Sequence, residues 1–342
     1  MRISDFDYDL PEELIAQAPL AQRDASRMLV LDRRTQTWTD SSFHSLTNYL
    51  EPADVVVINN TRVIRARLLG RRRGSGGRVE VFLVRRLDND DWQALVRPGA
   101  RLKSGTIVDF SEQLSAEILS DPGPELRHVR FDCKGSFDEV LAQTGFIPLP
   151  PYIKRAETSE EDRERYQTVY ARHSGAIAAP TAGLHFTDDV LASVRQICTV
   201  AEITLHVGYG TFEPVRVDEV ERHAVSGERY EIGSDAARAI NAARGRAGRV
   251  IAIGTTTARA LEAAANDQGE VMAQHGEATL TILPGHEFRA IDALLTNFHL
   301  PRSSLLLLVS AFAGKDLVLG AYKHAVDQRY RFYSYGDCML IL

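Results

Sequence analysis

Two segments combine glycine with histidine and are the first places where this sequence could do chemistry. The segment AAPTAGLHF (178–186) contains Gly183, which permits a close approach of the backbone, and His185, whose imidazole titrates near neutral pH. The segment TLHVGYGTF (204–212) runs from a predicted strand into Gly208-Tyr209-Gly210, where backbone amides can face an anionic or nucleotide-like ligand. Ordinary turns also contain GxG, so a purely structural role stays open for both segments.

A third segment, VIAIGTTTARALE (250–262), carries a more specific pattern. Its apolar start predicts a buried strand, Gly254 predicts a tight turn, and Thr255 to Thr257 offer an N-cap and free amides at the start of a helix. Such a helix start suits carboxylates or ribose oxygens. The segment lacks GxxxxGK followed by Ser or Thr, which disfavours an ATP-hydrolysing P-loop. A capped helix without a ligand is the alternative.

Polar side chains also gather near the C-terminal end of the sequence. The segment LLTNFHLPRSSLLLLVSAFAG (294–314) places three of them beside a long apolar run, as at the lip of a binding site: Asn297, His299 and Arg302. The final stretch RYRFYSYGDCMLIL adds Arg331, Tyr335 and Asp337. Arginines and aromatic rings can stack on unpaired RNA bases, although core packing explains the aromatic residues equally well.

Several classes of chemistry find no support in the sequence. The three cysteines, Cys133, Cys198 and Cys338, form no CxxC pair, and HExxH is missing. We therefore expect neither a disulfide framework nor a metal site. The sequence also lacks the GxSxG elbow of many serine hydrolases, so hydrolase chemistry is disfavoured.

The elements that must hold these residues are predicted by composition and periodicity. The 342 residues are 44% hydrophobic and 25% charged, which predicts a sizeable core and two domains. The longest apolar run, 305–309, is far shorter than the roughly 20 residues that cross a bilayer. The N-terminus MRISDFDYDLPEEL is acidic and lacks the apolar stretch of a secretory signal. We therefore expect a cytoplasmic protein outside the membrane.

The pattern of short and long elements predicts an α/β (α+β) main domain, 1–61 plus 150–342, with a small antiparallel β-barrel inserted over 62–149. In the insert, strands are expected at 63–69, 78–84, 92–96, 106–110, 116–119 and 128–131, followed by a helix over 136–145. In the main domain, strands are expected at 28–31, 55–58, 200–207, 249–253 and 278–283. Helices are expected at 43–50, 159–166, 187–196, 234–247, 256–266 and 316–329.

Charge is distributed unevenly between these parts. The chain carries a net charge of −6, yet the stretch 62–103 holds twelve basic and four acidic residues, a local charge of +8. The basic residues are Arg62, Arg65, Arg67, Arg71, Arg72, Arg73, Arg78, Arg85, Arg86, Arg97, Arg101 and Lys103. A solvated basic surface and a nucleic-acid contact are both compatible with this stretch, and the asymmetry favours nucleic acid.

Taken together, the segments resemble the S-adenosylmethionine:tRNA ribosyltransferase-isomerase family of queuosine biosynthesis. The resemblance covers essentially the whole chain, from FDYDLPEELIAQAPLAQRDASRMLVLDR through VVINNTRVIRARLLG, GFIPLPPYI and RYQTVYA to the four segments above and YRFYSYGDCMLIL. It implies that S-adenosylmethionine is a ribosyl donor, that adenine and methionine are released, and that 7-aminomethyl-7-deazaguanine at the tRNA wobble position becomes epoxyqueuosine. It implies no prosthetic group, no metal and no obligate protein partner.

The chemistry implied by this resemblance assigns expected roles to residues. A sulfonium acidifies the neighbouring ribose carbon, so a base must remove that proton and a donor must assist the leaving adenine. His185 and His206 are the candidates, with Asp337 or Glu228 as carboxylate alternatives. We expect ligand contacts from Thr181, Gly183, Gly208, Gly210, Thr211, Gly254, Thr255 and Thr256. Asn297, His299 and Arg331 are expected to orient the ribose, the carboxylate or the target base.

The sequence departs from the family pattern at one position. The family has an HxMHxE-like segment after the FxPV motif, whereas this chain has HAVSGE (223–228), with Ser226 where a second histidine is usual. The roles of His223 and Glu228 depend on that difference. One alternative is therefore a tRNA-binding homologue with impaired catalysis. An S-adenosylmethionine-dependent RNA methyltransferase is disfavoured because no GxGxxG with a following ribose-binding acid occurs.

Overall fold

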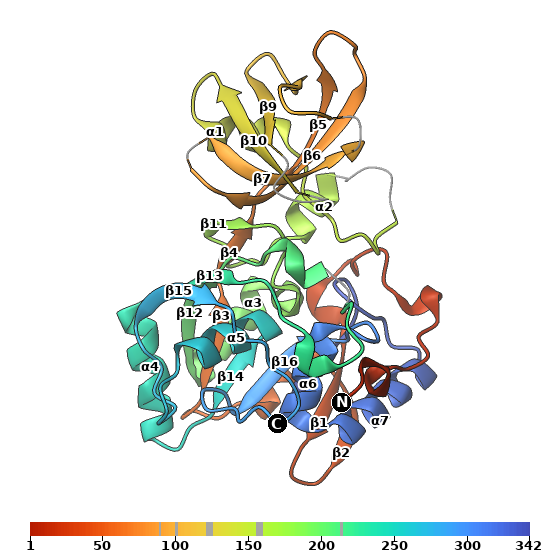
Figure 1. Ribbon diagram of the computed structural model, residues 1–342. Coiled ribbons are helices and arrows are strands. Elements are labelled where there is room, and N and C mark those ends of the chain that lie inside the picture. Colours follow the sequence, from red (N-terminus) through yellow and green to blue (C-terminus); the bar gives the residue numbers. More distant parts are fainter. Residues whose placement is uncertain (89, 100–101, 121–125, 155–159, 213–214) are drawn as a thin grey trace.

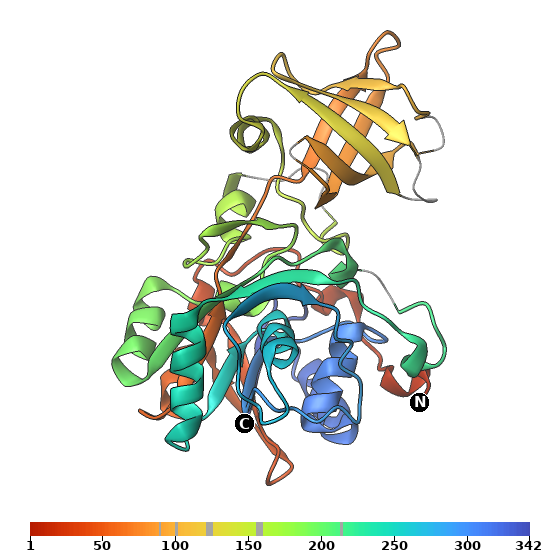
Figure 2. The ribbon, with the colours of Figure 1, turned by 60° about the vertical axis from the view of Figure 1, so that its left-hand side comes forward.

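The computed structural model describes the chain except for residues 89, 100–101, 121–125, 155–159 and 213–214. Two bodies are visible, a large one built on a mixed β-sheet and a small β-barrel that stands at one end of it (Figure 1). The turned view in Figure 2 shows that the barrel is set apart from the helices of the large body. This is the predicted α/β fold with an antiparallel barrel.

The sheet of the large body has nine strands in the order β15-β13-β12-β3-β14-β16-β17-β1-β2. Neighbouring strands β12, β3, β14 and β16 are parallel to one another. All five residues of β3 are buried, as expected for a central parallel strand covered on both faces. The bounds are β1 Arg27–Asp32, β2 Thr37–Ser42, β3 Val55–Asn59, β12 Thr199–Leu205, β13 Glu228–Ile232, β14 Val250–Ile253, β15 Gln274–Ala278, β16 Ala293–Asn297 and β17 Cys338–Ile341.

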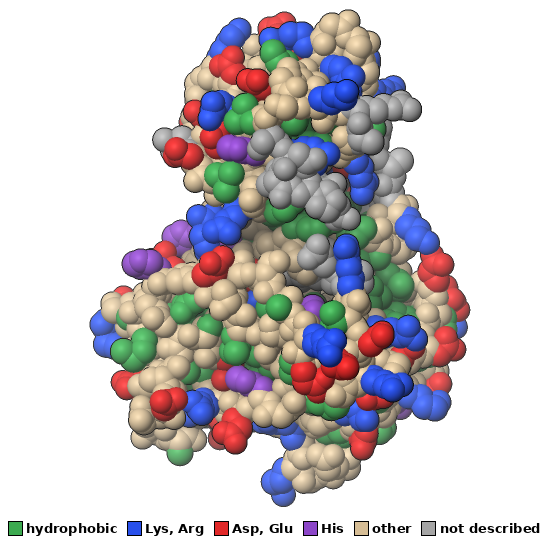
Figure 3. Space-filling model, in the orientation of Figure 1, with side chains coloured by type: hydrophobic (Ala, Val, Ile, Leu, Met, Phe, Trp, Pro, Cys, Tyr) green, Lys and Arg blue, Asp and Glu red, His purple; other side chains and the backbone are tan. Residues whose placement is uncertain are grey.

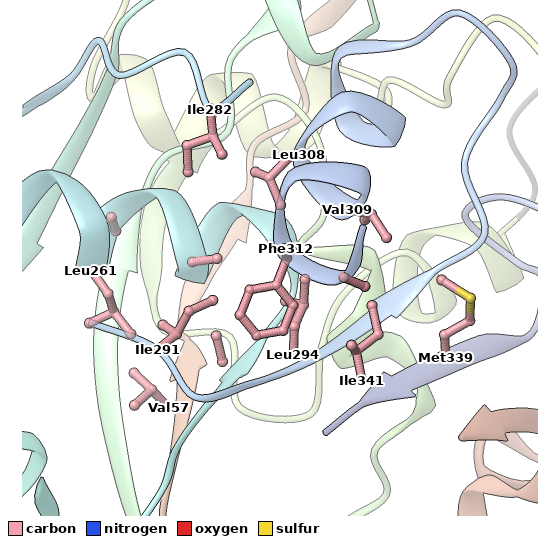
Figure 4. Close-up of a cluster of buried hydrophobic side chains, with 14 of the residues drawn as sticks. Val57, Leu261, Ile282, Ile291, Leu294, Leu308, Val309, Phe312, Met339 and Ile341 are labelled. Atoms are coloured by element: carbon pink, nitrogen blue, oxygen red, sulfur yellow. The ribbon is translucent and has the colours of Figure 1, made fainter. Parts of the chain in front are cut away.

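The sheet separates two hydrophobic cores, because alternate side chains of a strand point to opposite faces. Val55 and Val57 pack with helices α4 to α7, whereas Val56 and Ile58 pack with helix α3 and the 3-10 helix η4. Figure 4 shows the larger core, where side chains from β3, β16, α5 and α6 meet around Phe312. The helices are α3 Asp188–Ile197, α4 Ser234–Gly245, α5 Thr255–Ala264, α6 Ser304–Ala313, α7 Lys315–Asp327 and η4 Phe43–Tyr49.

The barrel closes in the order β10-β7-β6-β5-β8-β9. Alternating buried and exposed residues along β6 and β7 fill its interior with a core of its own, which helix α1 also joins. A two-stranded parallel pair, β4 with β11, lies where the chain passes between the bodies. The bounds are β4 Thr61–Val63, β5 Arg67–Arg72, β6 Arg78–Arg86, β7 Asp91–Arg97, β8 Ile107–Asp109, β9 Leu114–Ser120, β10 Leu126–Cys133, α1 Phe137–Thr144, α2 Glu160–Arg165 and β11 His173–Ala176.

Some sequence predictions of single elements were wrong. The strand expected at 63–69 is two strands, β4 and β5, because the chain crosses from one body to the other between them. A strand was expected at 278–283, but the observed strand β15 precedes this range and ends at Ala278. It is an edge strand of polar, mostly exposed residues. The helix expected at 43–50 is a 3-10 helix, and helix α5 begins at Thr255 with Gly254 as its N-cap.

Within the described part of the chain, no single helix is long and apolar enough to cross a bilayer. Helices α6 and α7 satisfy the length and hydropathy test only as a pair, and they are bent by 116° relative to each other.

Candidate functional site

A cleft of about 930 Å³ lies between the barrel and the large body. Strands β6 and β7 contribute one wall, and the segments that follow β12 and precede β13 contribute the other. Contacts between described residues bridge it: the rings of Phe82 and Tyr209 lie 5.6 Å apart, and Arg85 Nη1 lies 3.9 Å from Glu277 Oε1. Figure 3 shows this waist of the molecule with basic side chains beside it.

Strand direction explains why distant motifs meet near this cleft. The carboxyl ends of parallel strands lie at the same edge of a sheet, where α/β proteins commonly bind ligands. The histidine and the GYG turn follow β12, the threonine cluster follows β14, and the FHLP segment follows β16. Asn59, the last residue of β3, and Asn60 lie between them, because β3 stands between β12 and β14.

His206 lines the cleft with one ring nitrogen held and the other available. Its Nδ1 lies 2.8 Å from Thr61 Oγ1, and Thr61 donates a long hydrogen bond of 3.4 Å to the His173 carbonyl. When the single hydroxyl proton of Thr61 is donated to the His173 carbonyl, the Thr61 oxygen accepts from Nδ1–H and the lone pair of the ring is on Nε2. Burial, reinforced by the charge of Arg229, lowers the pKa of His206 to about 4, so the ring is neutral at physiological pH.

Glu228 fixes the backbone of the GYG turn. One carboxylate oxygen accepts from the Gly208 amide at 2.9 Å, and the other accepts from Arg259 Nη1 at 2.7 Å. Both members of this ion pair are buried, with 3% and 6% exposure. Gly210 faces Ser226, whose Oγ would lie 2.9 Å from a Cβ added at Gly210. Ser226 and Glu228 also line the cleft.

A second, smaller cavity of about 40 Å³ adjoins the cleft, and Val207 lines both. Six of the predicted ligand-binding residues line this cavity: Thr181, Gly254, Thr255, Thr256, Asn297 and His299. Burial lowers the pKa of His299 to about 3, so its ring is neutral, and its Nε2 lies 2.8 Å from Thr296 Oγ1.

His185 lies on the other side of Asn297, with both ring nitrogens engaged. Its Nδ1 lies 2.8 Å from Ser26 Oγ, and its Nε2 lies 3.2 Å from Asn297 Nδ2. Because the amide donates to Nε2, the proton of the ring is on Nδ1. Burial lowers the pKa of His185 to about 4, with smaller effects from two arginines. The ring therefore fixes the orientation of the Asn297 amide.

Three further predicted residues, Asp337, Arg331 and Gly183, line neither of the two cavities. Asp337 accepts hydrogen bonds from the backbone amides of Arg27 and Arg331, and burial raises its pKa. The Arg331 guanidinium donates to the Ala18 carbonyl. A Cβ at Gly183 would lie 2.1 Å from Tyr170 Oη, so this glycine serves close packing. The side chain of Thr211 belongs to the part that the structure does not describe.

Six of the twelve basic residues of the stretch 62–103 lie at two places. Arg62, Arg65, Arg85 and Arg86 line the cleft. Arg71 and Arg73 lie at the far end of β5, where Arg73 pairs with Asp109 at 2.5 Å. Arg101 lies outside the described residues. Sequence reasoning did not single out Thr61 or Arg259, although both belong to the quoted motifs VVINNTR and VIAIGTTTARALE. Among the described residues, no group of three or more His, Cys, Asp or Glu side chains is placed to hold a metal ion.

Comparison with known proteins covers the chain almost completely. The model of the family described as "Queuosine biosynthesis protein" matches residues 3–341. Proteins named S-adenosylmethionine:tRNA ribosyltransferase-isomerase from Syntrophotalea carbinolica and Pelotomaculum thermopropionicum are 51% and 50% identical, each over all of both chains. The crystal structure of S-adenosylmethionine tRNA ribosyltransferase from Thermotoga maritima is 38% identical, covers 99% of this chain and 100% of its own, and gives a TM-score of 0.57. The chain therefore belongs to the queuosine biosynthesis protein family.

Proposed function

We propose that this chain transfers the ribosyl portion of S-adenosylmethionine to 7-aminomethyl-7-deazaguanine at the wobble position of a tRNA anticodon. The transferred ribosyl group is isomerised to give epoxyqueuosine, and adenine and methionine are released. Membership of the family supports the proposal, because the relatives are named for the donor, for tRNA and for both reaction types. S-adenosylmethionine is a co-substrate in this scheme and no prosthetic group takes part.

The cleft between the two bodies is the observation that carries the proposal. Its volume of about 930 Å³ lies within the range of roughly 300–1,000 Å³ that is usual for ligand sites. Arginines from the barrel side and a neutral histidine from the large body face the same space. A nucleoside donor and an anionic RNA loop both find complementary groups there.

His206 is the proposed general base. A base must carry a lone pair at the pH of the reaction and lie at the substrate; the position of His206 in the wall of the cleft and its lowered pKa support this assignment. The contact of Thr61 with Nδ1 supports this role, because a third group commonly orients a catalytic histidine. Glu228 is a positioning residue for the GYG turn, because its two oxygens are used by Gly208 and Arg259.

The large body, 1–61 plus 150–342, is proposed as the donor-binding and catalytic domain, and 62–149 as the RNA-binding insert. The local charge of +8 over 62–103 supports this division of labour. Part of that charge lines the cleft and part lies on the far end of the barrel. In this arrangement the barrel holds the phosphate backbone while the anticodon base enters the cleft.

Incubation of the protein with S-adenosylmethionine and tRNA carrying 7-aminomethyl-7-deazaguanine tests the function directly. The expected result is release of one adenine and one methionine for each modified base, measured by chromatography and mass spectrometry. A methyltransferase would instead give S-adenosylhomocysteine and methylated RNA. A catalytically impaired homologue would bind the tRNA and release no adenine, and either result would overturn the proposal.

A further inference from the structure

The start of helix α5 is buried and uncapped. Its N-cap is Gly254, which has a φ of 94° and no side chain, and Thr255 to Thr257 are at most 7% exposed. None of the amides of these three threonines has a hydrogen-bond acceptor among the described residues. A buried helix start normally finds a cap, water or a ligand for these amides. The start of α5 is therefore built to receive an acceptor.

Two side-chain oxygens in the same cavity also lack partners. Thr256 Oγ1 and Asn297 Oδ1 are buried and have no hydrogen-bond partner in the described chain. Asn297 is 2% exposed, and its Nδ2 is used fully, by His185 Nε2 and by the carbonyls of Tyr333 and Asp337. These bonds fix the amide so that Oδ1 is an acceptor for a donor that comes from outside the protein.

The side chains that line this cavity bring no formal charge of their own. Among the described residues that line it, none is Lys, Arg, Asp or Glu, and the pKa of His299 is lowered to about 3 by burial. The cavity therefore presents amide donors at the helix start and neutral acceptors opposite, without a net charge. A group that carries a carboxylate beside an ammonium matches this pattern, because helix starts favour anions and amide oxygens accept from cations.

We propose that this cavity holds the α-amino-acid end of S-adenosylmethionine. The carboxylate accepts from the α5 amides and the Thr256 hydroxyl, and the ammonium donates to Asn297 Oδ1. Val207 lines both spaces, so the sulfonium, ribose and adenine extend from this cavity into the cleft beside His206. His185 is then a positioning residue, because it orients the Asn297 amide. The inference rests on the proposed function for the identity of the donor.

Calorimetric titration of Thr256→Val with three ligands tests the inference. Valine keeps the shape of threonine and removes an oxygen that has no protein partner, so the thermal midpoint should stay unchanged. S-adenosylmethionine should bind about 10- to 100-fold more weakly, the usual effect of losing a hydrogen bond to a charged group. Decarboxylated S-adenosylmethionine and 5′-methylthioadenosine, which lack the carboxylate, should bind the variant and the parent protein equally.

Thr257→Val is the matched control. Thr257 Oγ1 donates to the Ile253 carbonyl at 2.7 Å, and this residue does not line the cavity. The control should lower the thermal midpoint and leave the affinity ratio between S-adenosylmethionine and its decarboxylated analogue unchanged. A change in that ratio equal to the change in Thr256→Val would overturn the proposal.

The results of these titrations distinguish a failure of the inference about the cavity from a failure of the proposed function. If Thr256→Val weakens 5′-methylthioadenosine as much as S-adenosylmethionine, a ribose occupies the cavity and the inference is wrong. If the parent protein binds S-adenosylmethionine and its decarboxylated analogue equally but still releases adenine, only the inference fails. If S-adenosylmethionine does not bind at all, the proposed function fails with it.

Discussion

His185 and His206 differ in the hydrogen bonds that their rings make. Burial lowers the pKa of both to about 4, so both are neutral at physiological pH. In His185 both nitrogens are engaged, whereas in His206 the described residues contact Nδ1 and offer no hydrogen-bond partner to Nε2. The sequence places both residues in glycine-rich turns and does not distinguish them. The distinction depends on Ser26 and Thr61, which are distant in the sequence.

Replacing His206 by alanine should remove the general base. We expect kcat for adenine release to fall by about 10²- to 10⁴-fold, the usual contribution of general-base catalysis, while Kd for S-adenosylmethionine stays within about threefold. The lowered pKa also predicts a level rate of the parent enzyme from pH 8 to pH 5, since the ring stays unprotonated above about 4. An unshifted histidine would lose activity below about pH 6.5.

The exposed neighbour His173 supplies the control for this measurement. It lies close enough to His206 to lower its pKa, and its own side chain is exposed. His173→Gln should leave kcat unchanged. If His206→Ala also releases adenine at a near-normal rate, His206 is not the general base.

Ser226 stands where the family pattern has a histidine, and its side chain faces Gly210 in the GYG turn. If His206 is the base, Ser226→His should change kcat by less than about tenfold, well short of the effect of a general base. Steady-state kinetics of adenine release measure this. A gain of a hundredfold or more would mean that the missing histidine is an essential group.

At the scale of elements, strong local signals were predictable and edge elements were not. Helix α3 is an example of the first kind, since Thr187 caps it by accepting from the Val190 amide at 3.2 Å. Strand β15 is an example of the second, because QHGEA is polar and mostly exposed and shows no hydrophobic alternation. The motifs at the strand ends were also predictable. Their division between two cavities was not, because it depends on the order of strands in the sheet.

Gly183 lies in the 3-10 helix η6 (Thr181–His185), which packs against the chain near Tyr170. A Cβ there would lie 2.1 Å from Tyr170 Oη and 2.8 Å from Thr168 Cγ2. Gly183→Ala should therefore lower the free energy of unfolding by about 1–3 kcal/mol, as overpacking commonly does. Urea denaturation measures this change. Adding Tyr170→Phe should recover part of the loss.

Gly245 is the control for this substitution, because no atom lies within 4 Å of a Cβ added there. As the last residue of helix α4 it should accept alanine with unchanged or slightly higher stability. A Gly183→Ala protein as stable as its parent would show that η6 shifts freely.

Asp54 joins the starts of β3 and β14 and makes stability depend on pH. Its carboxylate accepts from the Arg249 side chain at 2.6 Å, from the Arg249 amide and from the Glu51 amide. Burial alone would raise the pKa of Asp54, but these hydrogen bonds outweigh it and the net pKa is lowered. The stabilisation is therefore complete above the unfolded pKa of about 3.9 and is lost as pH falls through the lower folded pKa.

Asp54→Asn should lower the free energy of unfolding at pH 7 by about 1–3 kcal/mol, because Arg249 loses a charged acceptor. The difference between parent and variant should shrink as pH falls below about 4 in urea denaturation. Asp235→Asn, at a carboxylate that is 91% exposed, should show no such dependence. A difference that stays constant from pH 7 to pH 3 would contradict the assignment to Asp54.

At the scale of the whole molecule, the barrel and the large body face each other across the cleft. Phe82 with Tyr209 and Arg85 with Glu277 connect them across it. Composition predicted a basic insert but not where its charge would point. The structure places some of these arginines at the cleft and others at the far end of β5, so a tRNA bound to both would lie along the barrel with its loop in the cleft.

This division predicts two distinct responses of tRNA binding to salt. Replacing Arg71, Arg72 and Arg73 by glutamine should weaken binding and reduce the slope of log K against log salt by about one to three, since each phosphate contact contributes about 0.7 to 0.9. Because Asp109 already pairs with Arg73, we expect the slope to fall by closer to one than to three. At saturating tRNA, kcat should be unchanged, because none of the three lines the cleft.

Replacing Arg62, which does line the cleft, should lower kcat as well as affinity. Arg246, exposed just after helix α4, is the matched control and should change neither. Filter binding at several salt concentrations measures the slopes, and an unchanged slope in the triple variant would place the RNA backbone on the cleft arginines alone.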